Sequence, residues 1–229
     1  MTVQVIQHTS AEFLGLIEDH LEGRSIRFRY CRPFTGKVPL PKPDALDDGL
    51  ILLGGGPWGS AGTRDVPTLK EEILLARAAL EQEKPIVGIG LGAQILALAA
   101  GGGAQKSELE FSVGTAKRVT DTALEGYLPA EYPFAIYMRD WALPPPAAEI
   151  LATDEKGRAA LWQLGGRALG FAGHPGLKVA MVEDLVMEFE EVAPDVEAGL
   201  AALRAAQRGI EDALVPLMTG VVKIMGWMR

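Results

Sequence analysis

Three glycine-rich segments and one histidine are the features of this chain with the clearest chemical potential. Residues 53–57 read Leu-Gly-Gly-Gly-Pro, residues 88–92 read Gly-Ile-Gly-Leu-Gly, and residues 170–176 read Gly-Phe-Ala-Gly-His-Pro-Gly. The second segment follows an apolar stretch and opens an apolar helix, and this strand–turn–helix geometry holds the nucleophile of many α/β enzymes. Its apex is Gly90, which has no side chain, and the third segment supplies a base, His174. The pattern therefore predicts a catalytic architecture without its attacking group.

Strands and helices alternate around these segments in the first half of the chain. Apolar patterns predict strands near residues 3–5, 26–30, 50–53 and 85–89, and helices over residues 11–21, 69–80 and 91–100. Ser10 is a candidate cap for the first helix, and Thr68 with Glu71 forms a capping-box pattern before the second. This order predicts an α/β fold of flavodoxin-like type: a doubly wound, mostly parallel sheet with helices on both faces.

The second half of the chain has a different pattern. Short strands are expected at residues 111–119, 134–138, 150–153, 160–164 and 169–172, separated by turn residues. They indicate antiparallel additions and a return to the sheet. A helical tail follows over about residues 177–229, with expected breaks near Pro194 and Pro216. We expect one domain spanning residues 1–229.

Composition and charge narrow the classes of partner. The chain has 229 residues, of which 48% are hydrophobic and 23% charged, with a net charge of −8. An acidic protein lacks the basic surface that nucleic acids and anionic membranes require, so we expect neither partner. Residues 85–105 are uncharged and long enough to span a membrane, but six glycines and Pro85 favour a buried strand and helix. A single cysteine, Cys31, excludes an intramolecular disulfide, and no signal-peptide pattern is visible at the N-terminus, so we expect a cytoplasmic protein.

Together the three glycine-rich segments resemble the class I glutamine amidotransferases, the family with a Cys-His-Glu triad. The resemblance spans nearly the whole chain, including the helical tail. It implies that the first segment, with Gly54, Gly55 and Gly56, supplies a backbone N–H to an oxyanion hole. It also implies that the second segment carries the nucleophilic cysteine at the position of Gly90. The third would carry the base, His174, and a glutamate two residues later that orients it.

Two of the three triad positions depart from that pattern. Glycine stands at position 90 in place of the cysteine and at position 176 in place of the glutamate, so that only His174 matches. Amide cleavage by this chemistry needs a thiolate, a base within hydrogen-bond reach and a group that holds the base. Loss of the nucleophile from a comparable triad lowers turnover by about a millionfold. The sequence therefore predicts a pseudoenzyme with a degenerate triad and no glutaminase activity.

Several roles remain open for such a chain. One is binding of a small amino-acid-like or carboxylate ligand by Gly54–Gly56, Leu91, Gln94 and His174, because amides at a helix start attract anions. Another is binding of a partner protein or a second copy through the apolar tail residues, which could equally pack on their own domain; these are Leu214, Leu217, Val221, Ile224 and Trp227. The alternative function is a glutamine-hydrolysing amidotransferase whose nucleophile has been replaced by Gly90. A different reaction, with water placed by His174, ranks last.

The remaining polar residues suggest structural roles. His8 and His20 are expected at the surface or at strand ends, and the three histidines lack metal-binding spacing, so we expect no metal and no cofactor. Cys31 is expected to be a packed thiol. Glu110 and Asp140 lack a second acid at an acid–base spacing, which favours solvated or structural positions.

Overall fold

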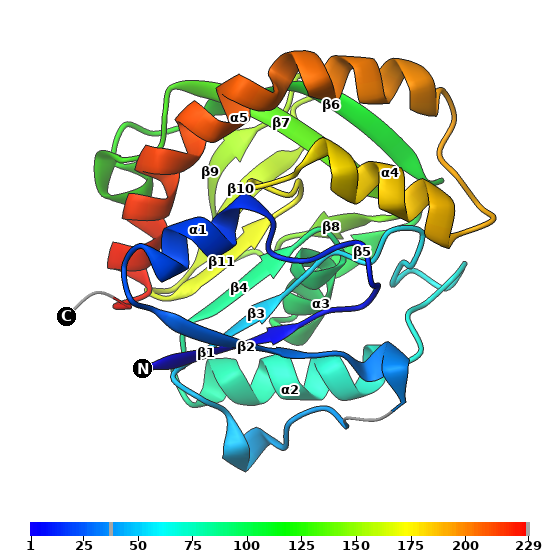
Figure 1. Ribbon diagram of the computed structural model, residues 1–229. Helices are drawn as coiled ribbons and strands as arrows, with labels where there is room; N and C mark the ends of the chain where they lie inside the picture. The colour runs from blue at the N-terminus through cyan, green and yellow to red at the C-terminus, as the bar shows by residue number, and fades with distance from the viewer. Residues whose placement is uncertain (37–38, 228–229) are drawn as a thin grey trace.

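A nine-stranded sheet forms the centre of the computed structural model, which describes residues 1–36 and 39–227 (Figure 1). The strand order is β2-β1-β3-β4-β11-β10-β9-β6-β7. The first five strands are parallel: β2 (Arg27–Cys31), β1 (Thr2–Ile6), β3 (Gly49–Leu52), β4 (Ile86–Ile89) and β11 (Ala168–Phe171). The sheet continues antiparallel through β10 (Ala159–Leu164), β9 (Glu149–Thr153), β6 (Glu110–Arg118) and β7 (Glu131–Met138). The predicted mostly parallel sheet with antiparallel additions is confirmed.

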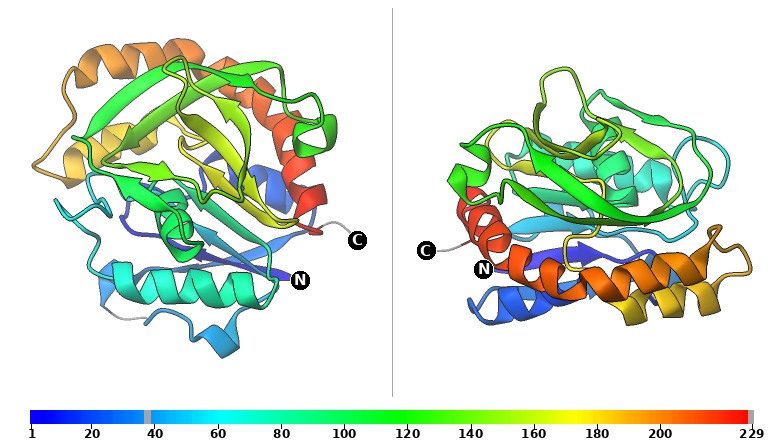
Figure 2. Two further views of the ribbon diagram at one scale, coloured as in Figure 1. Left: turned by 180° about the vertical axis from the view of Figure 1, so that it is seen from behind. Right: turned by 90° about the horizontal axis from the view of Figure 1, so that it is seen from above.

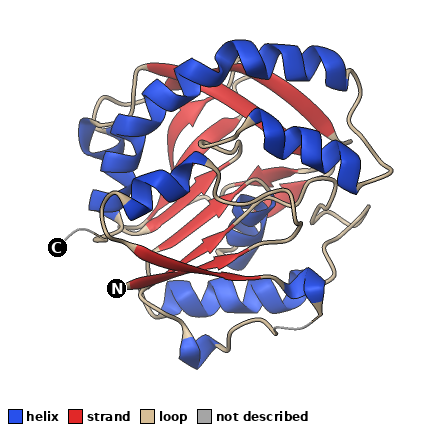
Figure 3. Ribbon diagram, viewed as in Figure 1, coloured by secondary structure: helices blue, strands red, loops and turns tan. Residues whose placement is uncertain are grey.

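Helices cover both faces of the sheet (Figures 2 and 3). On one face lie α2 (Leu69–Glu81) and α3 (Leu91–Ala99); on the other lie α1 (Leu16–Glu22), α4 (Val179–Glu188) and α5 (Val196–Ile224). Alternate residues of a strand point to opposite faces. Accordingly, Leu50 and Leu52 belong to the core under α2 and α3, and Ile51 to the core under α1 and α5. Burial on both faces explains why the central strands are apolar throughout.

Short elements complete the chain. A two-stranded ribbon, β5 (Gly103–Gln105) with β8 (Trp141–Leu143), packs beside α3, and three single-turn helices are η1 (Pro33–Thr35), η2 (Pro43–Ala45) and η3 (Ala123–Gly126). Three-residue strands have too few alternations to be recognised in a sequence, which is why the ribbon was not predicted. Gly101, with φ of 84°, follows the end of α3, where the left-handed conformation favours glycine.

The first helix begins at Leu16, not at residue 11, and Ser10 does not cap it. The backbone N–H groups of residues 10–12, which precede α1, donate to side chains and not to carbonyls of a helical turn. Ser10 N–H and Ala11 N–H donate to the Glu188 carboxylate at the end of α4, both at 3.1 Å, and Glu12 N–H donates to Thr9 Oγ1 at 3.0 Å. Because these tertiary bonds replace helical ones, residues 10–15 form a loop across the carboxyl edge of the sheet.

Two further helix boundaries differ from expectation. α2 starts after Thr68 as predicted, but the Thr68 hydroxyl donates to the Glu72 carboxylate at 2.5 Å and caps no backbone group, so the capping box is absent. α5 runs through Pro216 without ending, whereas the break near Pro194 is present. An interior proline costs a helix one hydrogen bond. Here the buried side chains of Leu214 and Leu217 hold both sides of Pro216 on the core.

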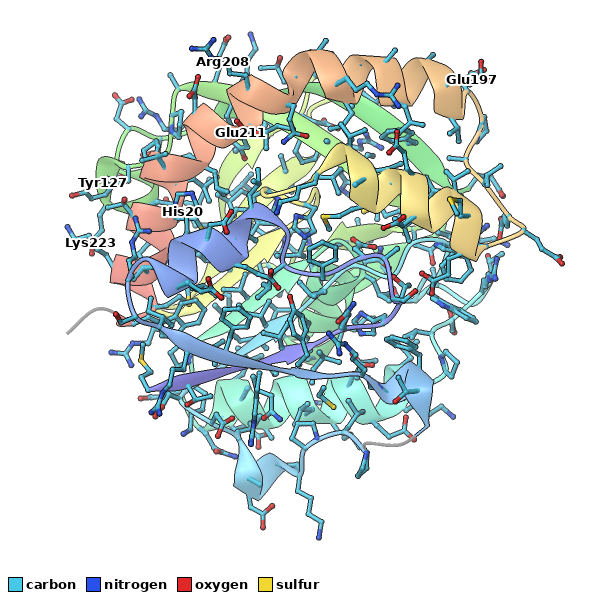
Figure 4. The ribbon with its side chains drawn as sticks, viewed as in Figure 1. His20, Tyr127, Glu197, Arg208, Glu211 and Lys223 are labelled. Carbon is cyan, nitrogen blue, oxygen red and sulfur yellow. The ribbon has the colours of Figure 1, made fainter. Side chains whose placement is uncertain are left out.

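The apolar face of the tail packs on its own sheet. Leu214, Leu217, Val221 and Trp227 are buried in the core under α1 and α5, and Ile224 packs against it. Lys223 fixes the end of α5 to η3 through Glu125, at 3.2 Å, and through the Tyr127 ring (Figure 4). This face is therefore not free for a partner. Residues 228 and 229 of the predicted tail lie outside the described residues, and no helix of the described part is long and apolar enough to cross a membrane.

Candidate functional site

The turn between β4 and α3 has the geometry of a nucleophile elbow. Gly90 sits at its apex with φ of 55° and ψ of −115°, a conformation that is strained for any residue with a side chain. Its N–H donates to Phe171 O at 2.8 Å, which ties the turn to β11. A Cβ atom at position 90 would lie 3.4 Å from Gly54 Cα and 4.0 Å from Ala172 O. There is thus room for a side chain at the apex, and the obstacle is the backbone conformation.

A buried carboxylate, Glu12, lies against the glycine segment that follows β3. Glu12 Oε2 accepts a hydrogen bond from Gly56 N–H at 2.8 Å. A Cβ atom at position 54 would lie only 1.6 Å from Glu12 Oε1, so the carboxylate occupies the space that a side chain at position 54 would fill. The Glu12 carboxylate can therefore lie here only because residue 54 is glycine.

The charge state of Glu12 is set by opposing effects. Burial raises its pKa to about 7, and the Glu188 carboxylate acts in the same direction. The Gly56 N–H and the nearby His8 favour the ionised form and oppose this shift. At neutral pH the group therefore titrates between a carboxylate and a neutral acid, whereas a solvated glutamate would be fully ionised.

His8 is buried, contrary to the expected surface position, although it does follow the end of β1. Its Nε2 lies 2.7 Å from Glu72 Oε2, and its Nδ1 lies 3.0 Å from Gly54 O. Both partners are acceptors, so both ring nitrogens donate. Burial lowers the pKa of His8, but the Glu72 carboxylate, the Gly54 carbonyl and the Glu12 carboxylate together more than offset this, and the net pKa is raised. The resulting imidazolium fixes the carbonyl of Gly54 and leaves a positive charge near Glu12.

His174 is held by hydrogen bonds at both ring nitrogens. Gly176 N–H donates to Nδ1 at 3.1 Å, so Nδ1 carries the lone pair and Nε2 carries the proton. Nε2 in turn donates to Phe13 O at 2.7 Å. Burial lowers the pKa of His174 to about 4, so the ring is neutral at physiological pH. Neither nitrogen is directed at the elbow as a free base.

The helix α1 occupies the surroundings of Gly176. Gly176 O accepts a hydrogen bond from Leu16 N–H at 3.0 Å, and a Cβ atom at position 176 would lie 3.0 Å from both Cγ1 and N of Ile17. Gly15 packs just as closely, since a Cβ atom there would lie 2.3 Å from Gly176 O. A glutamate at position 176 would require α1 to move.

One stretch of chain therefore contacts both the first and the third glycine-rich segments. We refer to residues 9–15 as the plug segment: Glu12 lies on Gly54 and Gly56, Phe13 O accepts from His174, and Gly15 packs on Gly176. A cavity of about 760 Å³ lies elsewhere. It is lined by Lys84, Leu164 and Arg167 among others, at the amino-terminal edge of the sheet opposite the elbow.

The two remaining predicted ligand residues are engaged within the protein. Gln94 is fully buried; its Oε1 accepts from the Ser60 hydroxyl at 2.6 Å, and its Nε2 donates to Arg139 O at 2.8 Å. Leu91 begins α3 and packs against Gly55, because a Cβ atom there would lie 2.5 Å from Leu91 Cδ2. Its N–H is among the helix-start donors that have no acceptor within the helix.

The other polar residues have structural positions. Asp140 is buried at φ of 60° and accepts N–H bonds from Ser60, Ala61 and Ser107, and Glu110 pairs with Lys156 and Arg158. Cys31 is buried, which raises the pKa of its thiol. His20 lies on α1 beside Arg24, which bonds to Thr219 of α5 (Figure 4). Within residues 1–36 and 39–227, no three His, Cys, Asp or Glu side chains gather as metal ligands would.

Glu12 is the site residue that sequence reasoning missed. It lies in a stretch that was assigned to a helix, where an acidic residue indicates an exposed face. A usable signal exists, because Glu12 is flanked by Ala11, Phe13 and Leu14 a few residues after the end of the first strand. Parallel sheets bind ligands at the carboxyl ends of their strands, so a single acid in an apolar loop at that edge is a candidate site residue.

Comparisons with known proteins agree with this geometry. The model of the family "Glutamine amidotransferase class-I" matches residues 28–178. A glutamine-hydrolysing GMP synthase from Aeropyrum pernix is 31% identical over 166 residues, which is 69% of this chain but only 31% of that protein. Among solved structures, a glutamine amidotransferase from Thermotoga maritima aligns with a TM-score of 0.82 at 23% identity, covering 98% of both chains. One from Methylobacillus flagellatus aligns with a TM-score of 0.80 at 24% identity, covering 97% of this chain and 94% of that one. These two likenesses establish the fold.

Proposed function

This chain belongs to the class I glutamine amidotransferase family, and we propose that it is a binding protein of that family that does not hydrolyse glutamine. The proposal is supported most strongly by Gly90 at the apex of the elbow, where amide cleavage needs a thiolate. His174 adds support, because both of its nitrogens are bonded within the protein and its pKa is lowered to about 4 by burial. A Cβ atom at position 176 would lie 3.0 Å from Ile17 of α1, so an orienting acid there would require α1 to shift.

A protein partner fits this proposal better than a free amino acid. The plug segment contacts both the glycine motif and His174, so in the described conformation it occupies space that a free amino acid would need there. In the GMP synthase relative, the matching region is less than a third of a longer protein. By analogy with that relative, we expect this region to act beside another domain or polypeptide. Homodimerisation and a cytoplasmic location stay predictions.

One observation favours the alternative function, a glutaminase whose nucleophile has been replaced. The apex has room for a Cβ atom, with 3.4 Å to Gly54 Cα as the shortest contact. The surroundings of Gly176 oppose it, because restoring the glutamate there requires a rearrangement of α1. We therefore rank the alternative second.

The test is an assay of the natural polypeptide with glutamine. We expect no ammonia above the protein-free background and no heat on calorimetric titration with glutamine or glutamate at pH 7, because the site is filled. Both assays are run at enzyme concentrations of tens of micromolar, with a family member that carries the full triad as the positive control. Catalytic ammonia release by the natural chain would refute the proposal.

A further inference from the structure

The carboxylate of Glu12 is buried against the glycine segment that follows β3. Its Oε2 accepts the Gly56 N–H at 2.8 Å, and its Oε1 lies over the Cα of Gly54. We propose that Gly54 and Gly56 form a carboxylate pocket whose resident ligand is Glu12, and that this pocket takes up acetate when the Glu12 carboxylate is removed. The inference rests on the proposed function, because a site in turnover could not hold a permanent occupant.

Shape is the first argument for a specific pocket. Glu12 Oε1, Cδ and Oε2 would lie 1.6, 2.3 and 2.7 Å from a Cβ atom at position 54, so the whole planar group rests on the bare Cα of Gly54. Such an approach is possible only at glycine. Removal of the carboxylate therefore leaves a cavity whose wall at Gly54 is bare backbone.

Electrostatics is the second argument. A buried carboxylate is costly unless donors and positive charge compensate it. Gly56 N–H supplies the donor, and the His8 imidazolium supplies the charge, held by Glu72 on one side and Gly54 O on the other. Glu188 is the opposing charge, and it binds Ser10 N–H and Ala11 N–H of the neighbouring backbone. These groups compensate the burial only in part, because the pKa of Glu12 is still raised to about 7. With Glu12 gone, the donor and the cation remain, and they can hold a carboxyl group of the same shape.

The plug segment keeps its anchors when the carboxylate is removed. Glu188 holds the backbone of Ser10 and Ala11, Phe13 O accepts from His174, and Leu16 N–H donates to Gly176 O. None of these bonds involves the Glu12 side chain. The variant Glu12→Ala is therefore expected to leave a preformed cavity, and acetate has the same carbon and oxygen atoms as the missing part of Glu12.

The experiment measures the melting temperature of Glu12→Ala in sodium acetate against sodium chloride of equal ionic strength at pH 7. At an acetate concentration ten times its Kd, the unfolding constant falls about tenfold and the melting temperature rises by about 3–5 °C. The natural chain and Glu12→Gln should show no acetate effect, since the glutamine side chain refills the pocket. Glu22→Ala, at an exposed position of α1, controls for nonspecific effects of losing an acid.

Acetamide has the same shape as acetate and no charge, so it tests the shape of the cavity alone. Because burial raises the pKa of Glu12 to about 7, this environment favours the neutral group, and we expect acetamide to stabilise Glu12→Ala at least as well as acetate does. Equal melting temperatures of Glu12→Ala in acetate and chloride would overturn the inference. If the variant does not fold in chloride, recovery of folded protein by refolding in acetate supports the inference, and equal failure in both salts overturns it. Ammonia release plays no part in these outcomes, so they are independent of the test of the proposed function.

Discussion

A cysteine introduced at position 90 will release no measurable ammonia from glutamine, although it restores the missing nucleophile. The reason is the state of His174, whose Nδ1 accepts from Gly176 N–H and whose Nε2 donates to Phe13 O. Nucleophile and base act as a unit in such sites, so one restored member recovers little of a roughly millionfold loss. In addition, the new side chain would point at Gly54 beside the Glu12 carboxylate, and a neighbouring negative charge disfavours a thiolate.

Ammonia release is measured with Gly90→Cys in a Cys31→Ala background, so that the introduced thiol is the only one. Gly90→Ser is the matched control, with the same backbone strain and no thiol. The φ of 55° at the apex should cost either variant about 1–3 kcal/mol of stability, which denaturant unfolding will report. A Gly90→Cys variant that turns over glutamine many times, while Gly90→Ser does not, would show that His174 is available as a base.

Substitution of Gly54 by alanine will strongly destabilise the protein, and removal of the Glu12 side chain will relieve much of that loss. The added Cβ atom would lie 1.6 Å from Glu12 Oε1, so Gly54→Ala must expel a buried carboxylate from its hydrogen bond. We expect a loss of about 3 kcal/mol or more in the free energy of unfolding. In Glu12→Ala the same methyl group enters the vacated space, so the double variant should be more stable than the sum of its parts by about 1–3 kcal/mol.

The free energies of unfolding in urea are measured for the natural chain, the two single variants and the double variant, which together form a double-mutant cycle. Gly166→Ala is the matched control, because a Cβ atom there meets nothing within 4 Å and the residue does not have a positive φ. Strict additivity of Gly54→Ala and Glu12→Ala would mean that the Glu12 carboxylate does not occupy the space above Gly54, which would remove the basis of the carboxylate pocket.

The sequence was sufficient for the architecture because the central strands are apolar on both faces and glycine marks their ends. The apolar run of residues 50–53 before Gly54 fits a strand buried on both faces. The glycines around Gly90 fit a tight turn between a strand and a helix. The first helix was placed five residues too early, since the spacing of apolar residues cannot show that Ser10 and Ala11 donate to Glu188, far along the chain.

The triad positions that we propose to be vacant could be identified in the sequence, whereas the contacts of the plug segment at the site could not. Gly90 and Gly176 are single positions in recognisable motifs. The role of Glu12 depends on tertiary contacts with Gly56, and the state of His174 depends on a carbonyl of Phe13. Nearly any residue type can supply a backbone N–H or carbonyl, so the sequence does not reveal such contacts. For the same reason, His8 looked like a surface residue until its burial between Glu72 and Gly54 was known.

The protonation state of His174 tests the central claim most directly, and ¹⁵N NMR of the histidine rings measures it. The account predicts a neutral ring with the proton on Nε2 and a pKa near 4, the low value that follows from burial. A folded-state pKa below the ordinary 6.5 also means that protonation of His174 on acidification destabilises the fold, so stability contributed by this residue falls as the pH drops from about 6.5 towards 4. A ring that titrates near pH 6.5, or that carries its proton on Nδ1 with Nε2 free, would contradict the claim that the plug segment has taken this histidine out of use.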